Sequence, residues 1–216
     1  MAREFANTAG SPDIDYITYS AVPPVASLAT CSIVARLSGD SDAPNYANAI
    51  TATSPSYIND VALFRSGTAN TISACFRNGG SARVTFPFTF DGTMRSVIFT
   101  YNGPAAPNCV IGYLDGVSQT LGGSTNNGTI GTGQTAFLVG GVAGFRWNGK
   151  IAEAAIYNRV ITAAEAAMHG AGYSCMHFPR GLIFYAPLIR EVGDIVGGLT
   201  GTITGTTVAD HPRIYA

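Results

Sequence analysis

The sequence predicts an all-β fold, a sandwich or barrel of antiparallel strands with one short helix near residues 162–169. Two observations carry this prediction. Short apolar or alternating runs recur along the 216 residues, and glycine, proline, asparagine and aspartate separate them. Only residues 147–172 change this rhythm, with a run of good helix formers. Short strands at this spacing do not match the alternating strands and helices of a parallel sheet.

The strand-like runs are bounded by turn residues. We expect strands within residues 27–37, 60–66, 71–78, 82–90, 95–102, 108–114, 135–141, 149–158, 181–188 and 199–205. Asp115 and Gly116 lie between two apolar runs and predict a tight hairpin, because both residue types tolerate positive φ. The predicted core includes Ile33, Val34, Leu63, Cys75, Val97, Phe99, Ile111, Leu114, Leu138, Ile151, Ile156 and Leu188.

The predicted helix begins with a capping box. Thr162 and Glu165 have the required spacing, in which the threonine hydroxyl accepts from the backbone N–H of Glu165 and the carboxylate reaches back. Strong helix formers follow, and Gly170 ends the run after about two turns. Glu165 is therefore interpreted as a helix cap.

Glu153 is the other glutamate of this region. Strand alternation places it on one face with Ile151, Ala155 and Tyr157. A structural carboxylate, held by a charged partner or by hydrogen bonds, is the favoured interpretation at that position. We do not expect Glu153 and Glu165 to form a catalytic pair.

Charge is scarce in this chain. Charged residues make up 12% of the sequence, against roughly 25% in average soluble domains, and the formal net charge is −1. This balance lacks the basic footprint of nucleic-acid binding and gives no electrostatic reason to bind an anionic membrane. Two readings stay open: a surface rich in threonine, serine, asparagine and glycine, or a surface partly covered by a partner.

Targeting signals and paired cysteines are not expected. The first residues lack the apolar segment of a signal peptide, and no run is long enough to span a membrane, so we expect synthesis in a cytosol. No CxxC spacing occurs, which argues against a zinc site. We expect unpaired, mostly core thiols at Cys31, Cys75, Cys109 and Cys175.

One long segment carries a family resemblance. The words "YLDG…FLVGG…FRWNGKIAEAAIYNRVITAAEAA" resemble the signature of LamG-like proteins in the concanavalin A-like lectin and glucanase jelly-roll superfamily. The residues that match are Tyr113, Asp115, Gly116, Gly149, Ile151, Glu153, Ile156, Tyr157, Asn158 and Glu165. The tail, "LIFYAPL" and "IVGGLTGTITGTTVADHPRIYA", is similar to that of stand-alone members encoded by tailed bacteriophages.

The resemblance implies a two-sheet antiparallel jelly-roll sandwich. It implies one LamG-like domain over residues 1–216, with a C-terminal strand and tail extension from about residue 178. The superfamily also contains glucanases, whose acidic residues cluster on one strand, and this sequence has no such cluster. None of His169, His177 and His211 has a neighbourhood typical of a nucleophile or a metal site. We therefore expect no enzymatic activity, no catalytic residue, no cofactor and no resident metal.

Two binding possibilities stay open at lower weight. Some LamG-type modules hold calcium with loop carboxylates, and the aspartates available for this are Asp40, Asp42, Asp60 and Asp91. Aromatic rings can stack on sugars, and the candidates are Tyr46, Tyr57, Phe145 and Trp147. For Trp147, packing at the edge of the sandwich is the favoured role.

The main functional expectation is a structural protein of a bacteriophage virion. It would be a capsid decoration or cement protein, or another accessory head protein, made in the host cytoplasm and bound to the major capsid protein or other virion proteins as a homo-oligomer. The predicted interface lies in the tail, at Arg213, Ile214 and Tyr215, because arginine and tyrosine are enriched where interfaces carry energy. The alternative is a carbohydrate-binding adhesin module of a phage tail or host-recognition apparatus, with a surface glycan as ligand. Neither nucleic acid nor a membrane is an expected partner.

Overall fold

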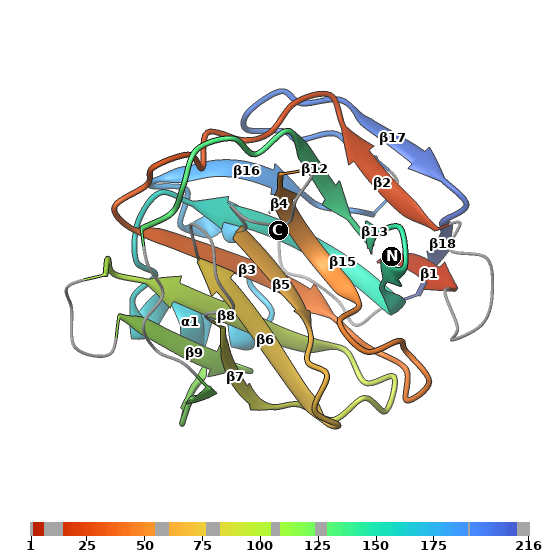
Figure 1. Ribbon diagram of the computed structural model, residues 1–216, viewed down its shortest axis with the longest axis horizontal. Helices are drawn as coiled ribbons and strands as arrows, with labels where there is room; N and C mark the ends of the chain where they lie inside the picture. The colour runs from red at the N-terminus through yellow and green to blue at the C-terminus, as the bar shows by residue number, and fades with distance from the viewer. Residues whose placement is uncertain are drawn as a thin grey trace.

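The computed structural model describes residues 2–6, 15–54, 61–76, 83–104, 109–123, 129–189 and 191–210. These residues form two antiparallel sheets packed face to face, with a short helix on the outer side of one sheet (Figure 1). The predicted two-sheet antiparallel sandwich is therefore confirmed. No helix within these ranges is long and apolar enough to span a membrane.

The first sheet, here called sheet A, has eight strands among the described residues. In spatial order, seven of them are β10 (Val117–Gln119), β9 (Val110–Leu114), β8 (Arg95–Tyr101), β3 (Cys31–Leu37), β15 (Asn148–Tyr157), β1 (Ala2–Ala6) and β18 (Thr207–Ala209). The eighth, β16 (Leu182–Ala186), pairs with the second half of β15, while β1 pairs with the first half. The long strand β15 thus holds three other strands in place.

The second sheet, sheet B, has ten strands among the described residues. Eight of them, in spatial order, are β11 (Gly122–Gly123), β7 (Val84–Pro87), β6 (Thr71–Phe76), β5 (Val61–Arg65), β4 (Asn48–Thr53), β12 (Ala136–Val139), β2 (Tyr16–Tyr19) and β17 (Gly201–Thr204). A small hairpin, β13 (Gly141–Val142) and β14 (Phe145–Arg146), extends β12, and Arg146 pairs with Asn48 in parallel. The segment beyond residue 178 therefore adds β16 and β18 to sheet A and β17 to sheet B.

The main core lies between the sheets and is rich in aromatic rings. Phe99 of sheet A stacks on Phe86 of sheet B with ring centroids 4.7 Å apart, and Phe184 meets Phe137 edge to face at 4.6 Å. Such pairs contribute about 0.5–1.5 kcal/mol beyond the burial of their area. Because they bridge opposite sheets, these rings hold the two layers together.

A second apolar cluster covers the outer face of sheet A. Helix α1 (Ala163–Gly170) and the 3-10 turn η1 (Cys175–His177) lie over this face. Tyr157 of β15 stacks on Phe178, and Ala166 of α1 is completely buried. Sheet A is thus buried on both sides, which explains why β3 reads as a nearly continuous apolar run.

The predicted helix and its cap are confirmed. The side chain of Thr162 accepts from the backbone N–H of Glu165, and the Glu165 carboxylate accepts from the backbone N–H of Thr162. The predicted hairpin is present between β9 and β10, with Asp115 at φ 48° and Gly116 at φ 80°. Both results follow from local sequence chemistry.

The hairpin and the helix meet at two glycines. A Cβ on Gly116 would lie 2.8 Å from the Cα of Ala167, and a Cβ on Gly170 would lie 2.5 Å from the carbonyl atoms of Asp115. Both distances are shorter than real Cβ contacts. A side chain at Gly116 would therefore clash with the helix, and a side chain at Gly170 would clash with the hairpin. The turn and the helix end therefore form one packed unit.

Most of the predicted core is buried, and all four cysteines are free and buried as expected. Ile111 and Leu114 were predicted to lie in the core, but each is only partly buried at the periphery of a cluster. Their strand, β9, lies next to the edge strand β10. The sequence prediction also missed β4, which lies in the middle of sheet B. Its residues, NAITAT, include two alanines, which have low strand propensity.

A bulge in β15 corrects the predicted face of Glu153. The register with β3 shifts between Ile151, which pairs with Leu37, and Glu153, which pairs with Arg36. An extra residue in one strand reverses the alternation of side chains beyond it. Ile151 therefore packs in the main core, whereas Tyr157 belongs to the outer cluster. The predicted common face of Ile151 and Glu153 is wrong.

Candidate functional site

A buried polar network ties α1 to sheet A. His169 Nε2 donates to Glu153 Oε2 over 2.9 Å, and the backbone N–H of Cys175 donates to Glu153 Oε1 over 2.8 Å. His169 Nδ1 lies 2.5 Å from the Ser96 hydroxyl, and Arg36 donates to the His169 carbonyl. Glu153 and His169 have no exposed surface. The interpretation of Glu153 as a paired structural carboxylate is confirmed.

The pKa of Glu153 reflects competing effects. Burial raises it, because a desolvated carboxylate is costly. The imidazole of His169 and the N–H of Cys175 act in the opposite direction, and they bring the pKa below its usual range. Glu153 is therefore ionised in the folded protein at neutral pH.

Ser96, His169 and Glu153 lie in the order of an acyl-transfer triad, but they serve packing here. Ser96 is 1% exposed and the other two side chains are 0% exposed, so no substrate carbonyl reaches the serine in this arrangement. An active triad needs a position about 3 Å from both the nucleophile and an oxyanion donor. The network instead fills the space between sheet A and α1.

Glu153, His169 and Cys175 also form the one group of three potential metal ligands found in the described part of the chain. Their ligand atoms lie within 4.8 Å of one another, and the donor types suit zinc. However, both imidazole nitrogens and both carboxylate oxygens already have hydrogen-bond partners. Four potential donor atoms of this group are thus already engaged in hydrogen bonds within the chain.

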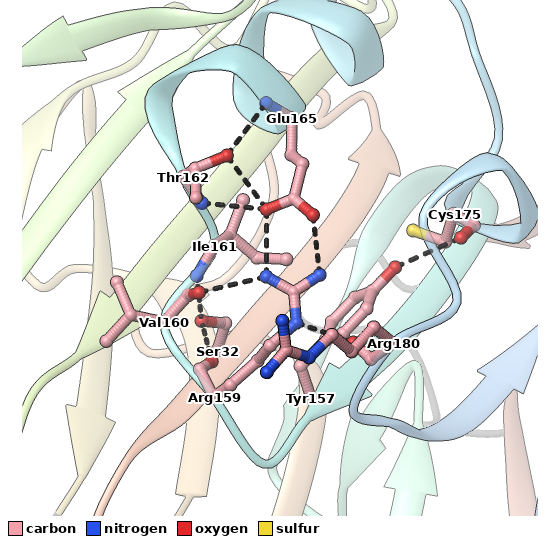
Figure 2. A network of polar contacts seen from close by, with 9 residues as sticks. All are labelled: Ser32, Tyr157, Arg159, Val160, Ile161, Thr162, Glu165, Cys175 and Arg180. Atoms are coloured by element: carbon pink, nitrogen blue, oxygen red, sulfur yellow. Dashed lines mark hydrogen bonds and ion pairs between the residues drawn. The ribbon is translucent and has the colours of Figure 1, made fainter.

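A second carboxylate network fixes the start of α1 (Figure 2). Arg159 binds Glu165 in a bidentate pair, with N···O distances of 2.8 and 2.7 Å. Thr162 donates to the same carboxylate from its backbone and its hydroxyl, each over 2.9 Å. Partial burial raises the pKa of Glu165, but the bonds from Arg159 and Thr162 outweigh it and lower the pKa to about 2. Glu165 is a cap, as predicted.

Solvent-exposed aromatic rings form a different kind of candidate site. Tyr46 and Phe145 are 40% and 39% exposed and meet edge to face with centroids 6.4 Å apart. The Asn48 side-chain amide donates to the carbonyls of both residues, at 3.0 and 3.4 Å. The guanidinium of Arg83 lies over the Tyr46 ring at 5.3 Å. Two of the predicted sugar-stacking residues are therefore held side by side.

The remaining predicted stacking residues do not join this pair. Trp147 is completely buried, and its indole Nε1 donates to the Ser38 carbonyl over 2.8 Å. It packs in the main core, whereas the sequence favoured packing at the edge of the sandwich. Tyr57 lies outside the described residues.

Among the described residues, the predicted calcium ligands Asp40, Asp42 and Asp91 do not gather into a group of potential metal ligands. Asp42 accepts from the side-chain amide of Asn148 over 2.7 Å, and Asp91 accepts from the backbone of Thr93 within its own turn. Burial, followed by the charge of Asp42, raises the pKa of Asp40. Asp60 lies outside the described residues. The carboxylates of Asp42 and Asp91 are thus engaged in hydrogen bonds within the chain.

Arg146 was not singled out from the sequence. It is 7% exposed, and its guanidinium lies 3.8 Å from the centroid of the Tyr16 ring. The sequence signal was weak: Arg146 is one charged residue between Phe145 and Trp147, after a long stretch without charge. The predicted interface residues Arg213, Ile214 and Tyr215 lie outside the described residues.

Comparison with solved structures identifies the architecture. A protein from Bacteroides ovatus whose proposed role is carbohydrate binding superposes with a TM-score of 0.67 at 18% identity, over 98% of this chain and 60% of that chain. The heptameric SAP-like pentraxin of Limulus polyphemus superposes with a TM-score of 0.60 at 13% identity, over 94% of both chains. The chain has a concanavalin A-like jelly-roll fold.

The likeness to other jelly rolls extends to a smaller module at lower similarity. The CBM40 of the Ruminococcus gnavus IT-sialidase superposes with a TM-score of 0.51 at 11% identity, over 78% of this chain and 97% of that chain. No family model and no curated protein matches the sequence. At these identities the likeness establishes the fold alone, and this chain spans only 60% of the length of the Bacteroides protein.

Proposed function

We propose that the protein is a carbohydrate-binding module and that the Tyr46–Phe145 pair is its sugar-stacking platform. The observation that carries the proposal is the exposed aromatic pair itself, fixed by hydrogen bonds from Asn48. Two solved proteins with the same fold support it, since both are named for carbohydrate binding.

The geometry suits a sugar for two physical reasons. An exposed ring offers an apolar face to the C–H groups of a pyranose while the sugar hydroxyls stay in contact with water. Gly67 allows the tyrosine to lie where it does, because a Cβ there would be 2.4 Å from the Tyr46 hydroxyl. A ring that is already ordered loses little conformational entropy when it binds. Tyr46 and Phe145 are therefore a pre-organised surface.

A glycan array followed by calorimetry tests this proposal. The wild-type protein binds at least one glycan class, and both Tyr46→Ala and Phe145→Ala weaken that binding by about tenfold or more. Tyr173→Ala is the matched control, because Tyr173 is equally exposed at 40% but lies beyond α1. Binding that is unaffected by the first two substitutions, or weakened equally by the third, contradicts the proposal.

A virion role stays a second candidate, as a decoration protein or as an adhesin module of a phage tail. The observation that favours it is a set of exposed apolar side chains on the last described segment: Ile195, Val196, Ile203 and Val208. They include residues of β17 and β18, the edge strands of the two sheets, and edges invite further pairing. Light scattering of the double variant Ile203→Ser and Val208→Ser tests this candidate. If these edges bind another copy of the chain, the variant has a lower oligomeric state than the wild type.

A further inference from the structure

The two rings of the exposed aromatic pair do not lie in one plane. The planes of Tyr46 and Phe145 meet at 79°, and the ring centroids are 6.4 Å apart. A flat ligand stacks on two rings at once only where the rings are nearly coplanar, because stacking needs overlap with the face of each ring. The pair therefore offers no common flat surface to a ligand.

Arg83, the residue before β7, restricts this surface further. Its guanidinium lies over the Tyr46 ring, 5.3 Å from the centroid. Arg83 is half-buried and forms no ion pair with a carboxylate of the described residues. A cation over one face of the ring leaves at most the other face for a sugar. It also places N–H donors beside the ring.

The backbone and its neighbours hold the rings in this arrangement. Tyr46 has φ 64°, a conformation that costs a residue with a side chain about 1–3 kcal/mol and persists where its surroundings hold it. The Asn48 amide donates to the carbonyls of Tyr46 and Phe145. The Tyr46 hydroxyl lies against Gly67, where an added Cβ would be 2.4 Å away. The rings therefore have little freedom to turn into a common plane.

The short separation of the rings decides how many sugar units they contact. A distance of 6.4 Å is close to the size of one pyranose with its substituents, so both rings contact the same unit. A unit that touches two perpendicular rings is enclosed on two sides, and its chain can continue in fewer directions. A terminal unit, which is linked to its chain at one position only, fits such a corner with the least hindrance.

We infer that the site binds the terminal unit of a soluble glycan chain or branch, and not the flat face of an insoluble polysaccharide. This inference rests on the proposed carbohydrate binding and names its ligand class. One ring stacks on the C–H face of the terminal unit, and the other covers an edge of that unit. Arg83 donates to the sugar hydroxyls and fixes their orientation.

The chain length and the physical form of the ligand test the inference. The soluble probes are the disaccharides and tetrasaccharides of cellulose, chitin and starch, and those of any further class that the glycan array selects. In each series that binds, calorimetry gives affinities for the two lengths within about threefold, because additional units lie beyond the ring pair. The insoluble probes are crystalline cellulose and crystalline chitin, and the protein does not sediment with either. An affinity that rises about tenfold or more from disaccharide to tetrasaccharide, or sedimentation with a crystalline probe, overturns the inference.

Variants locate the terminal unit at this corner. Gly67→Ala displaces the Tyr46 ring and weakens binding of the disaccharide about tenfold, whereas Gly193→Ala, whose new Cβ meets no atom within 3.9 Å, does not. Arg83→Gln removes a charge-assisted hydrogen bond and weakens binding about tenfold or more. Arg180→Gln, the same change at an exposed arginine before β16, is its control. Circular dichroism checks the fold of each variant. Unchanged affinity in both Gly67→Ala and Arg83→Gln overturns the placement of the ligand.

The two proposals fail in distinguishable ways. Sedimentation with crystalline cellulose that is lost in Tyr46→Ala overturns the terminal-unit inference and leaves carbohydrate binding through the pair standing. A steep gain of affinity with chain length that is lost in Phe145→Ala has the same meaning. Absence of binding to every soluble and insoluble glycan contradicts both proposals.

Discussion

Nε2 of His169 lies 2.9 Å from Oε2 of Glu153, and neither side chain has any exposed surface. The contact joins the last turn of α1 to the bulged strand β15. Because both partners are desolvated, removal of either one leaves the other buried without its bond. This relationship makes the outer cluster of sheet A a sensitive point for stability.

We predict that Glu153→Ala lowers the free energy of unfolding by about 3–5 kcal/mol, the range measured when one partner of a buried pair is removed. Chemical denaturation measures this change. Glu191→Ala, at an exposed glutamate, serves as the control and changes stability by less than about 0.5 kcal/mol. Equal effects of the two substitutions would show that the pair contributes nothing.

Acid should weaken the fold through the helix cap. The folded pKa of Glu165 is about 2, below the ordinary value of 4.5. Because the folded state favours the ionised carboxylate, Glu165 adds to the free energy of unfolding above pH 4.5. This contribution is lost as the pH falls towards 2. Glu153 acts in the same direction, because its pKa is also lowered. Urea titrations across this pH range should show that the free energy of unfolding falls less in Glu165→Gln than in the wild type.

Gly170 gives a prediction that opposes helix propensity. In an exposed helix, glycine to alanine stabilises by about 1 kcal/mol. Here a new Cβ would lie 2.5 Å from the backbone of Asp115, so Gly170→Ala should destabilise the protein by about 1–3 kcal/mol. Gly193→Ala is a matched control, because the nearest atom is 3.9 Å from its new Cβ. A higher midpoint of thermal unfolding for Gly170→Ala than for the wild type would contradict the close packing of helix and hairpin.

Trp147 offers a spectroscopic test of the core. It is the single tryptophan of the sequence and is completely buried. Its emission should therefore be blue-shifted in the folded protein and resistant to quenching by iodide, and unfolding should reverse both properties. A glycan that binds at the surface should leave the spectrum nearly unchanged. Strong iodide quenching of the native protein would place this ring at the surface instead.

The sequence predicted the features whose causes are local. The capping box of Thr162 and Glu165 and the Asp115–Gly116 hairpin depend on residues a few positions apart, and both are present as predicted. Most of the longer strands were also located, whereas β2 and β4 lie outside the predicted ranges. β4 was missed because its alanines carry little strand signal, although it lies in the middle of sheet B.

The candidate site depended on tertiary structure and could be predicted only in part. Tyr46 and Phe145 were named as possible stacking residues, but their contact joins a loop before β4 to the distant strand β14. The contact of Arg146 with the Tyr16 ring likewise joins two strands that are far apart in the sequence, β14 and β2. The bulge that directs Glu153 towards His169 is likewise a property of the pairing with β3.

The pairing of β1 sets the order in which the molecule can be completed during synthesis. Residues Ala2–Ala6 are synthesised before the other described strands, yet their neighbours in sheet A are β15 and, on the other side, β18 at residues Thr207–Ala209. Strand β1 must therefore wait, with its apolar Phe5 unburied, until β15 and β18 have been synthesised. Contacts over such long sequence separations also slow the search for the native state. We expect nascent chains that end before β15 to remain protease-sensitive and to be clients of chaperones.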